Sequence, residues 1–426
     1  MLDKPKTIWS WAFYDWANSA FATTIMAGFF PLFFKAYWAN QSDPSESTFY
    51  LGMANSTASI LVAILAPFLG AIADRGTAKK KFLFTFAFLG VIMSGGLWMI
   101  QKGDWQMAVI FYVLATIGFS GGNIFYDALL PGVASEKKVD YASSLGFSIG
   151  YLGGGLLFLV NVLMYLKPEV FGIADGSTAI KLSFLSVAVW WAVFSIPIFL
   201  WVEEPRIFEP VSVFRAIPLG WRQLVDTIKE IKHMKIVGTF LIAYWLYIDG
   251  VDTIIKMAVD YGIALGFPGS ALITAILMVQ FIAFPAALIY NWMASKIGVK
   301  QAVLIAIGGY CCITFLGYYM TAVWQFYALA VMVALFQGGI QALSRSMYTR
   351  LIPIEKSAEF FGFYNMIGKF AAVIGPALMG TVTLMTGNNR YGILSVLILF
   401  VLGGYLLYKV NIAEGQKMAQ EYLSEA

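Results

Sequence analysis

The sequence contains few charged residues, one histidine and two cysteines. Only 12% of its 426 residues are Asp, Glu, Lys or Arg, whereas soluble domains carry about 25%, so a soluble globular protein is excluded. Cys311 and Cys312 are neighbours in an apolar run and point in different directions on a helix, which argues against a disulfide. His233 stands beside Lys232 and Lys235 without other metal-ligating residues, so no metal site is expected.

Motifs of the common enzyme classes are also absent. The chain has no nucleophile elbow, no His-Glu-x-x-His pair, no phosphate-binding loop and no Cys/His metal spacing. We therefore predict that the protein is not an enzyme, has no cofactor and does not use ATP by itself. The glycine-rich segment 150–155 is typical of a helix-packing face. Nothing in the sequence indicates a nucleic-acid partner.

Long apolar segments account for most of the chain. Hydrophobic residues make up 60% of it, and the mean hydropathy is +0.75. A helix of about 20 apolar residues crosses a hydrocarbon core about 30 Å thick. We predict an all-α membrane protein, in contact with lipid, with twelve transmembrane helices near 8–38, 50–73, 82–101, 106–131, 142–166, 179–202, 236–259, 269–294, 301–321, 324–349, 360–386 and 391–410.

The one long polar connection divides these spans into two halves. We expect a first six-helix bundle at 1–202, a cytoplasmic linker at 203–235 with an amphipathic helix from 218, a second bundle at 236–410 and a cytoplasmic tail at 411–426. With both termini in the cytoplasm, about 20 of the 28 Lys and Arg residues lie on that side, as the positive-inside rule requires. We expect the plasma membrane of a bacterium.

Internal repetition supports two pseudo-symmetric halves. The fourth span carries GGNIFYDALLP at 121–131 and the tenth carries GGIQALSRSMYTRLIP at 338–353, each with a double glycine, a polar stripe and a closing proline. The spans that follow share glycine spacing, in LGFSIGYLGGG and FGFYNMIGKFAAVIGP. This six-plus-six layout resembles that of the major facilitator superfamily.

A loop between the second and third spans strengthens that resemblance. GAIADRGTAKKK at 70–81 is similar to the superfamily's signature, with Gly70 permitting close helix approach and Asp74 and Arg75 able to hydrogen-bond neighbouring helix ends. An ordinary basic cytoplasmic loop is the alternative. The corresponding loop of the second half has Asn291 and Ser295 in place of the glycine and the acid, so we expect no matching charge relay there.

Three further motifs resemble one branch of the superfamily. YDWANSAF in the first span, GGIQALSRS in the tenth and FGFYNMIGK in the eleventh together are similar to the vacuole-effluxer-like branch, which is related to the autophagy-linked amino-acid effluxer of fungal vacuoles. The resemblance implies a twelve-helix, alternating-access carrier for amino acids.

Polar residues inside the first-half spans are candidate site residues. A charge inside a span costs at least about 2.5–3.5 kcal/mol, so it normally faces a cavity or a partner. Asp15 and Asp127 both fall in the cytoplasmic half of their spans; Asn18 shares a helix face with Asp15, and Asn123 shares one with Asp127. Tyr126, beside Asp127, belongs to the same candidate set.

The second half supplies charges of the opposite sign at a similar depth. Arg345 shares a helix stripe with Gln337 and Gln341, and Lys369 has Asn365 one turn before it. We predict that the acids of one half pair with the bases of the other when the cytoplasmic side is closed. The alternatives are permanent pairs within each half, and charges that reach water from the span ends.

A separate group of charges lies in the outer half of the seventh span. Asp252 and Lys256 are spaced for a helical ion pair, and Asp249 lies one turn earlier. The group is predicted to form an outward gate or part of the substrate site, or else a self-neutralised pair.

Together these charges favour a small zwitterionic substrate, which needs both an anion and a cation to bind it. Burial of Asp15 or Asp127 favours the neutral form and a nearby Arg345 the charged form, so H+ is a candidate coupling ion. A multidrug or amphiphile exporter and a lipid flippase or scramblase are the alternative functions. We expect a monomer.

Overall fold

The computed structural model describes residues 2–39, 44–76, 78–204 and 235–425, and isolated residues between 218 and 225. Most of the amphipathic helix predicted from 218 lies outside the described residues. The side chains of Arg75 and Lys369 lie outside them as well.

The first half consists of six spans. Its helices are α1 (Pro5–Ala20), α3 (Pro44–Gly76), α4 (Lys79–Gly96), α5 (Trp105–Val133), α6 (Val139–Leu166) and α7 (Gly176–Trp201). The first span continues past α1 through η1 (Phe21–Phe29), α2 (Phe30–Phe33) and η2 (Phe34–Trp38), where η1 and η2 are π-helical. Short 3₁₀ turns follow α4 at Leu97–Met99 and α6 at Pro168–Phe171.

The second half repeats this arrangement. Its helices are α9 (Lys235–Ala264), α10 (Gly269–Ile297), α11 (Val299–Tyr319), α12 (Val323–Leu351), α13 (Ser357–Thr386), α14 (Asn389–Ser395) and α15 (Leu397–Lys409), followed by α16 (Ile412–Glu425). A 3₁₀ turn at Ile354–Lys356 precedes α13, and α14 and α15 together form the last span.

The number of spans agrees with the prediction. Among the described residues, 11 helical segments are long and apolar enough to cross a membrane, and α13, with 30 residues, is the remaining span. Several helices begin about three residues before the predicted start, because their first turns are polar and precede the apolar runs. The carboxylate of Asp175, for example, accepts a hydrogen bond of 2.7 Å from the amide of Thr178 at the start of α7.

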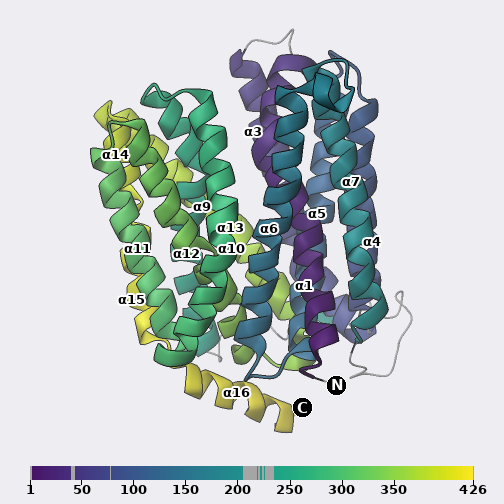
Figure 1. The fold of residues 1–426 in the computed structure, drawn as a ribbon. Helices are drawn as coiled ribbons and strands as arrows, with labels where there is room; N and C mark the ends of the chain where they lie inside the picture. The colour runs from purple at the N-terminus through teal and green to yellow at the C-terminus, as the bar shows by residue number, and fades with distance from the viewer. Residues whose placement is uncertain are drawn as a thin grey trace.

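The two halves form two bundles that lie side by side. Figure 1 shows α1 to α7 in one bundle and α9 to α15 in the other, with both chain termini at the same end of the molecule. We call this end the termini end. Across the interface, α13 packs against α3 and α10 against α6. At the termini end α16 runs beneath the helices from the second bundle toward the first, and it packs against α12 and α9.

One contact is repeated in both halves. In the first turn of α4, the ammonium of Lys80 donates to the carbonyls of Phe199 (2.8 Å) and Val202 (2.6 Å) at the end of α7. In the first turn of α11, Lys300 donates to the carbonyls of Tyr408 (2.7 Å) and Val410 (2.8 Å) at the end of α15. A cation stabilises a helix C-terminus, so each half joins its third span to its sixth in the same way.

Candidate functional site

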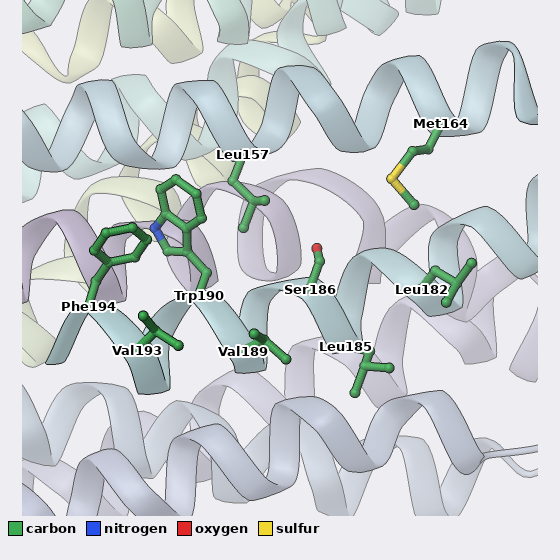
Figure 2. Close-up of a pocket in the computed structure, with 9 residues that line it drawn as sticks. All are labelled: Leu157, Met164, Leu182, Leu185, Ser186, Val189, Trp190, Val193 and Phe194. Carbon is green, nitrogen blue, oxygen red and sulfur yellow. The ribbon is translucent and has the colours of Figure 1, made fainter. Parts of the chain in front are cut away.

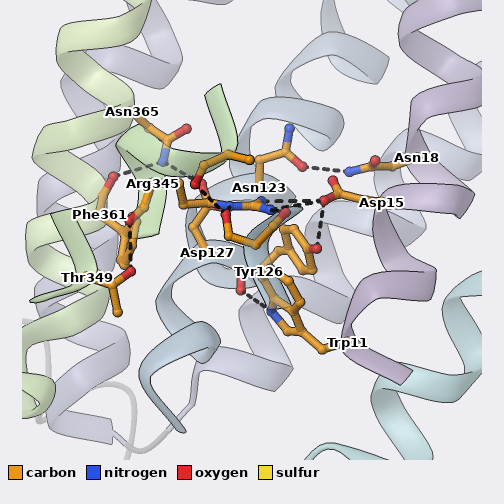
Figure 3. A network of polar contacts seen from close by, with 12 residues as sticks. Trp11, Asp15, Asn18, Asn123, Tyr126, Asp127, Arg345, Thr349, Phe361 and Asn365 are labelled. Carbon is orange, nitrogen blue, oxygen red and sulfur yellow. Dashed lines mark hydrogen bonds and ion pairs between the residues drawn. The ribbon is translucent and has the colours of Figure 1, made fainter. Parts of the chain in front are cut away.

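Arg345, near the end of α12, forms ion pairs with two carboxylates of the other half. Its guanidinium lies 3.0 Å from Asp127 on α5 and 3.4 Å from Asp15 on α1, as Figure 3 shows. We call these three residues the Arg345 cluster. The Arg345 side chain is only 4% exposed. The predicted pairing of acids and base across the interface is therefore present in this structure.

Polar and aromatic groups hold the guanidinium in place. Its Nε donates to the hydroxyl of Ser143 on α6 (2.9 Å), and one terminal nitrogen donates to the carbonyl of the same residue (3.0 Å). The rings of Trp11, Tyr126 and Phe147 lie within 4.3–5.4 Å of the guanidinium carbon. Since cation–π contacts strengthen when they are desolvated, Arg345 is fixed by hydrogen bonds and by ring faces.

The first-half residues are themselves ordered by short contacts. The hydroxyl of Tyr126 donates to Asp15 (2.8 Å), and the indole of Trp11 donates to the carbonyl of Tyr126 (2.9 Å) while stacking on its ring. The amide of Asn18 donates to the side chain of Asn123 (2.6 Å). The predicted residues of α1 and α5 thus meet as one network, and Trp11 is a member that sequence reasoning missed.

The burial of Arg345 and the location of its ion-pair partners rule out the two alternative interpretations for this residue. A side chain that reached water from the span end would be exposed, and Arg345 is not. A permanent pair within its own half would need an acid from α9 to α15, whereas both of its ion-pair partners belong to α1 and α5. Breaking a buried ion pair by removing one partner costs about 3–5 kcal/mol, so the Arg345 cluster strongly favours contact between the halves.

Asn365 on α13 extends this network from the second half. Its amide donates to the carbonyl of Phe361 one turn earlier (2.9 Å) and to the carboxylate of Asp127 (3.4 Å). Asp127 therefore receives contacts from both α12 and α13.

Gly146 makes room for the Arg345 cluster. A Cβ atom at this position of α6 would lie 2.6 Å from a carboxylate oxygen of Asp15, 2.9 Å from the hydroxyl of Tyr126 and 3.1 Å from Arg345. Only glycine fits at these distances without displacing the charged groups.

The predicted gating loop contacts the other half at the termini end. The carboxylate of Asp74 accepts hydrogen bonds from the backbone amides of Ala358 (3.1 Å) and Glu359 (2.9 Å), in the first turn of α13. It also pairs with Lys79 (2.9 Å), whose ammonium donates to Ser357 (2.7 Å). An acid from the first half thus caps a helix of the second, where it compensates the helix dipole. The expectation that Asp74 bonds a neighbouring helix end is confirmed.

Gly70 permits this approach, because a Cβ there would collide with the backbone of Ala358. In the second-half loop, Ser295 donates only to the carbonyl of Trp292 in its own helix (2.7 Å).

Another ion pair joins the two halves at the termini end. Arg350 at the end of α12 makes two contacts of 2.7 Å with Asp140, in the first turn of α6, and donates to the carbonyl of Glu136 (2.9 Å). Sequence reasoning missed this pair because both residues lie at span ends, where charge is common. The double glycine and closing proline of 338–353 were the available signal, since the proline places Arg350 where α12 leaves the membrane.

Asp249 and the Asp252–Lys256 pair have different surroundings. Asp249 is buried, and its oxygens accept hydrogen bonds of 3.0 Å from the amide of Gly375 in α13, next to Pro376. Asp252 and Lys256 lie 4.0 Å apart and are 28% and 54% exposed. Asp249 lies on the same side of α9 as Asp252, and its carboxylate packs against the backbone of α13.

Polar groups on the far side of the Arg345 cluster are only partly satisfied. Gln341 accepts a hydrogen bond of 2.7 Å from the hydroxyl of Tyr151 on α6. The indole nitrogen of Trp245 and the side-chain oxygen of Gln337 are buried and have no hydrogen-bond partner among the described residues. Buried polar groups normally have partners, so these atoms are suited to bind a polar solute or water.

The interface is closed at the termini end and more open beyond the cluster. Asp74, Lys79, Ser357 and Arg345 are all buried, whereas Gln337, Gln341, Asp252 and Lys256 are partly or largely exposed. The structure therefore represents a conformation closed at the termini end.

An apolar surface groove lies outside this site. It has a volume of about 510 Å³ and lies between α6 and α7, where Figure 2 shows apolar side chains around Trp190 and Ser186. None of the predicted site residues lines it. Among the described residues, no group of three or more His, Cys, Asp or Glu side chains is placed to hold a metal.

Similarity to known proteins agrees with this architecture. Residues 3–420 match the family model described as vacuole effluxer Atg22 like. An uncharacterised MFS-type transporter of Bacillus subtilis, YxiO, is 38% identical over 402 residues that cover 93% of each chain. Autophagy-related protein 22 of Yarrowia lipolytica is 24% identical, over 85% of this chain and 75% of its own.

Solved structures share the fold. The human organic anion transporter MFSD10 superimposes with a TM-score of 0.75 at 13% identity, covering 95% of this chain and all (100%) of its own. The proton:xylose symporter XylE gives a TM-score of 0.69 at 15% identity, covering 95% and 94%. The predicted major facilitator fold, with twelve helices in two bundles, is thereby confirmed. This chain belongs to the Atg22-like vacuole effluxer family and is a multi-pass membrane transporter of the major facilitator superfamily.

Proposed function

We propose that this protein is a secondary active transporter that moves a small zwitterionic solute, with amino acids as the substrate class, by alternating access. The observation that carries the proposal is the Arg345 cluster, in which a cation of the second half is buried between two carboxylates of the first. Opening at the termini end has to separate these charges, because they belong to different halves.

The separated charges define the substrate. An uncompensated charge is costly within a membrane span, so Asp15 and Asp127 each need a cation once Arg345 has moved away. The ammonium group of an amino acid supplies one, and its carboxylate can pair with the released guanidinium of Arg345. A zwitterion therefore compensates charges of both signs, which a neutral sugar or an apolar drug does not.

The roles of the other residues follow from their positions. Tyr126 and Asn365 orient the two carboxylates, and the hydrogen bond between Asn18 and Asn123 joins α1 to α5. Beyond the cluster, we assign solute contacts to Gln337, Gln341, Trp245, Asp252 and Lys256, which lie on the open side or have unsatisfied polar atoms. Asp74 and Gly70 serve the gate.

Charge balance favours H+ as the coupling ion. Two carboxylates face one guanidinium in the cluster, so one formal negative charge is in excess when all three groups are ionised. A single proton removes this excess, and it can be taken up or released as the halves separate.

The proposal also includes orientation and assembly. The distribution of Lys and Arg favours cytoplasmic termini, and the Bacillus subtilis relative is consistent with a bacterial plasma membrane. Both partners of the cluster come from one chain, so a monomer contains all the parts that this mechanism requires.

Transport by purified protein in liposomes tests the proposal. We expect labelled amino acids to accumulate when a proton gradient is imposed, and expect Arg345→Gln to reduce the initial rate about tenfold, equivalent to about 1.4 kcal/mol in the barrier. Lys296→Gln, an exposed charge on α10, is the matched control. Movement of labelled phospholipid without a gradient, or accumulation of apolar drugs but not amino acids, would favour the alternative functions instead.

A further inference from the structure

A polar cavity lies at the termini end, away from the Arg345 cluster. It has a volume of about 430 Å³ and is formed where the start of α11, the ends of α12 and α15, and the start of α16 meet. We call it the tail pocket, because α16 closes one side of it. Its lining includes Lys300, Arg350 and Lys409, together with the amide side chains of Gln301, Asn411 and Gln416.

The charged residues that line the tail pocket are all basic. Three of the residues that line it are cations, and none of them is an acid. Lys300 is held by two carbonyl groups at 2.7 and 2.8 Å, which fixes its ammonium at the wall of the pocket. Lys409 is exposed and rests on the ring of Tyr405 at 4.4 Å. Glu414 contacts Asn411 (3.2 Å) but does not line the pocket.

The position of the pocket relative to the membrane indicates which kind of anion binds in it. Lys300 lies in the first turn of one span, and Lys409 is the last residue of another. Spans end at the level of the lipid headgroups, where basic pockets bind anionic lipids. We propose that the tail pocket binds the phosphate group of an anionic phospholipid.

Arg350 connects this pocket to the gate. The same guanidinium lines the tail pocket and makes two contacts of 2.7 Å with Asp140 on the other half. A phosphate bound in the pocket competes with Asp140 for Arg350, so bound lipid weakens one contact that holds the halves together. By linkage, opening at the termini end tightens lipid binding by the same factor. The inference concerns binding at a separate site, so it does not depend on the proposed substrate.

Titration of the purified full-length protein with phosphatidylglycerol tests this inference. Bound lipid is counted by native mass spectrometry, and inorganic phosphate is titrated in parallel by thermal stability. We expect Lys409→Gln to weaken phosphatidylglycerol binding about fivefold, since each Lys near a membrane surface contributes about that factor, and we expect Lys296→Gln to leave it unchanged. Asp140→Asn should tighten binding, because Arg350 is then no longer shared.

The results separate the two sources of phosphate. Binding of phosphatidylglycerol but not of millimolar phosphate supports a lipid ligand. Binding of phosphate alone overturns the lipid assignment and indicates a soluble anion. Equal affinity of Lys409→Gln, Lys296→Gln and the unmodified protein for phosphatidylglycerol would overturn the site itself. Weaker binding by Asp140→Asn would overturn the competition for Arg350.

Discussion

The guanidinium of Arg345 and the carboxylate of Asp127 lie 3.0 Å apart, although 218 residues separate them in the sequence. One belongs to α12 and the other to α5, so their contact exists only while the two halves are closed together at the termini end. The pair therefore provides a direct way to test whether charge controls opening.

Exchange of these two charges should restore what each single change destroys. Arg345→Asp places three carboxylates together, and Asp127→Arg places two guanidinium groups together, so we expect both to abolish amino-acid uptake in liposomes. The double variant Asp127→Arg, Arg345→Asp re-forms an ion pair between the halves and should recover measurable uptake. If the double variant is as inactive as both single variants while remaining folded, the pairing is not what transport requires.

Gly146→Ala should lower stability by about 1–3 kcal/mol, the usual cost of overpacking. Its Cβ would lie 2.6 Å from Asp15 and displace the ion pair with Arg345. Gly380→Ala on α13 is the matched control, since no atom lies within 4 Å of its Cβ position, and it should be neutral or stabilising by about 0.5–1 kcal/mol. Thermal denaturation in detergent distinguishes the two; equal melting temperatures would contradict the role of Gly146.

Asp74→Asn should shift the protein toward a conformation open at the termini end. The substitution removes the charge that caps α13 and pairs with Lys79. Spin labels at positions 137 and 296, which are exposed at the termini end of opposite halves, measure the shift after Cys311 and Cys312 are replaced by Ser. We expect a larger population at long distance, and no change for Asp104→Asn at the opposite end.

Asp3 predicts a pH dependence at the N-terminus. Hydrogen bonds from the amide of Ser135 (2.9 Å) and from its hydroxyl (2.7 Å) lower the pKa of Asp3 below its usual value of 3.8. A carboxyl with a lowered pKa stabilises the fold above its unfolded pKa, and this contribution is lost as the pH falls through the folded value. The stability difference between the unmodified protein and Asp3→Asn should thus be constant from pH 7 to 5 and shrink below about pH 4. A difference that grows toward low pH would contradict this assignment.

The helices and the central charges could be predicted from the sequence because each has a strong local signal. Apolar runs have the length of a bilayer crossing, and Asp15, Asp127 and Arg345 are conspicuous because charge inside a span is costly. The two-half repeat then indicated which charges would face each other. The positions of these residues in the fold agree with that reasoning.

Contacts that depend on helix rotation and on backbone groups could not be predicted. The hydrogen bonds that Asp249 accepts from the backbone of α13 beside Pro376 have no signal in the sequence. Asp140 and Arg350 look like ordinary loop charges until α6 and α12 are placed side by side. Hydropathy records how deep a residue lies but not which neighbour it faces.

The paired lysines Lys80 and Lys300 have a mechanical consequence. Each joins the third helix of its half to the end of the last helix of the same half, by hydrogen bonds to two backbone carbonyl groups. Because these hydrogen bonds lie within one half, they persist when the halves separate, and each bundle moves as a rigid body. Opening therefore has to break the bonds that cross between the bundles, among them those of Asp74, Arg345 and Arg350.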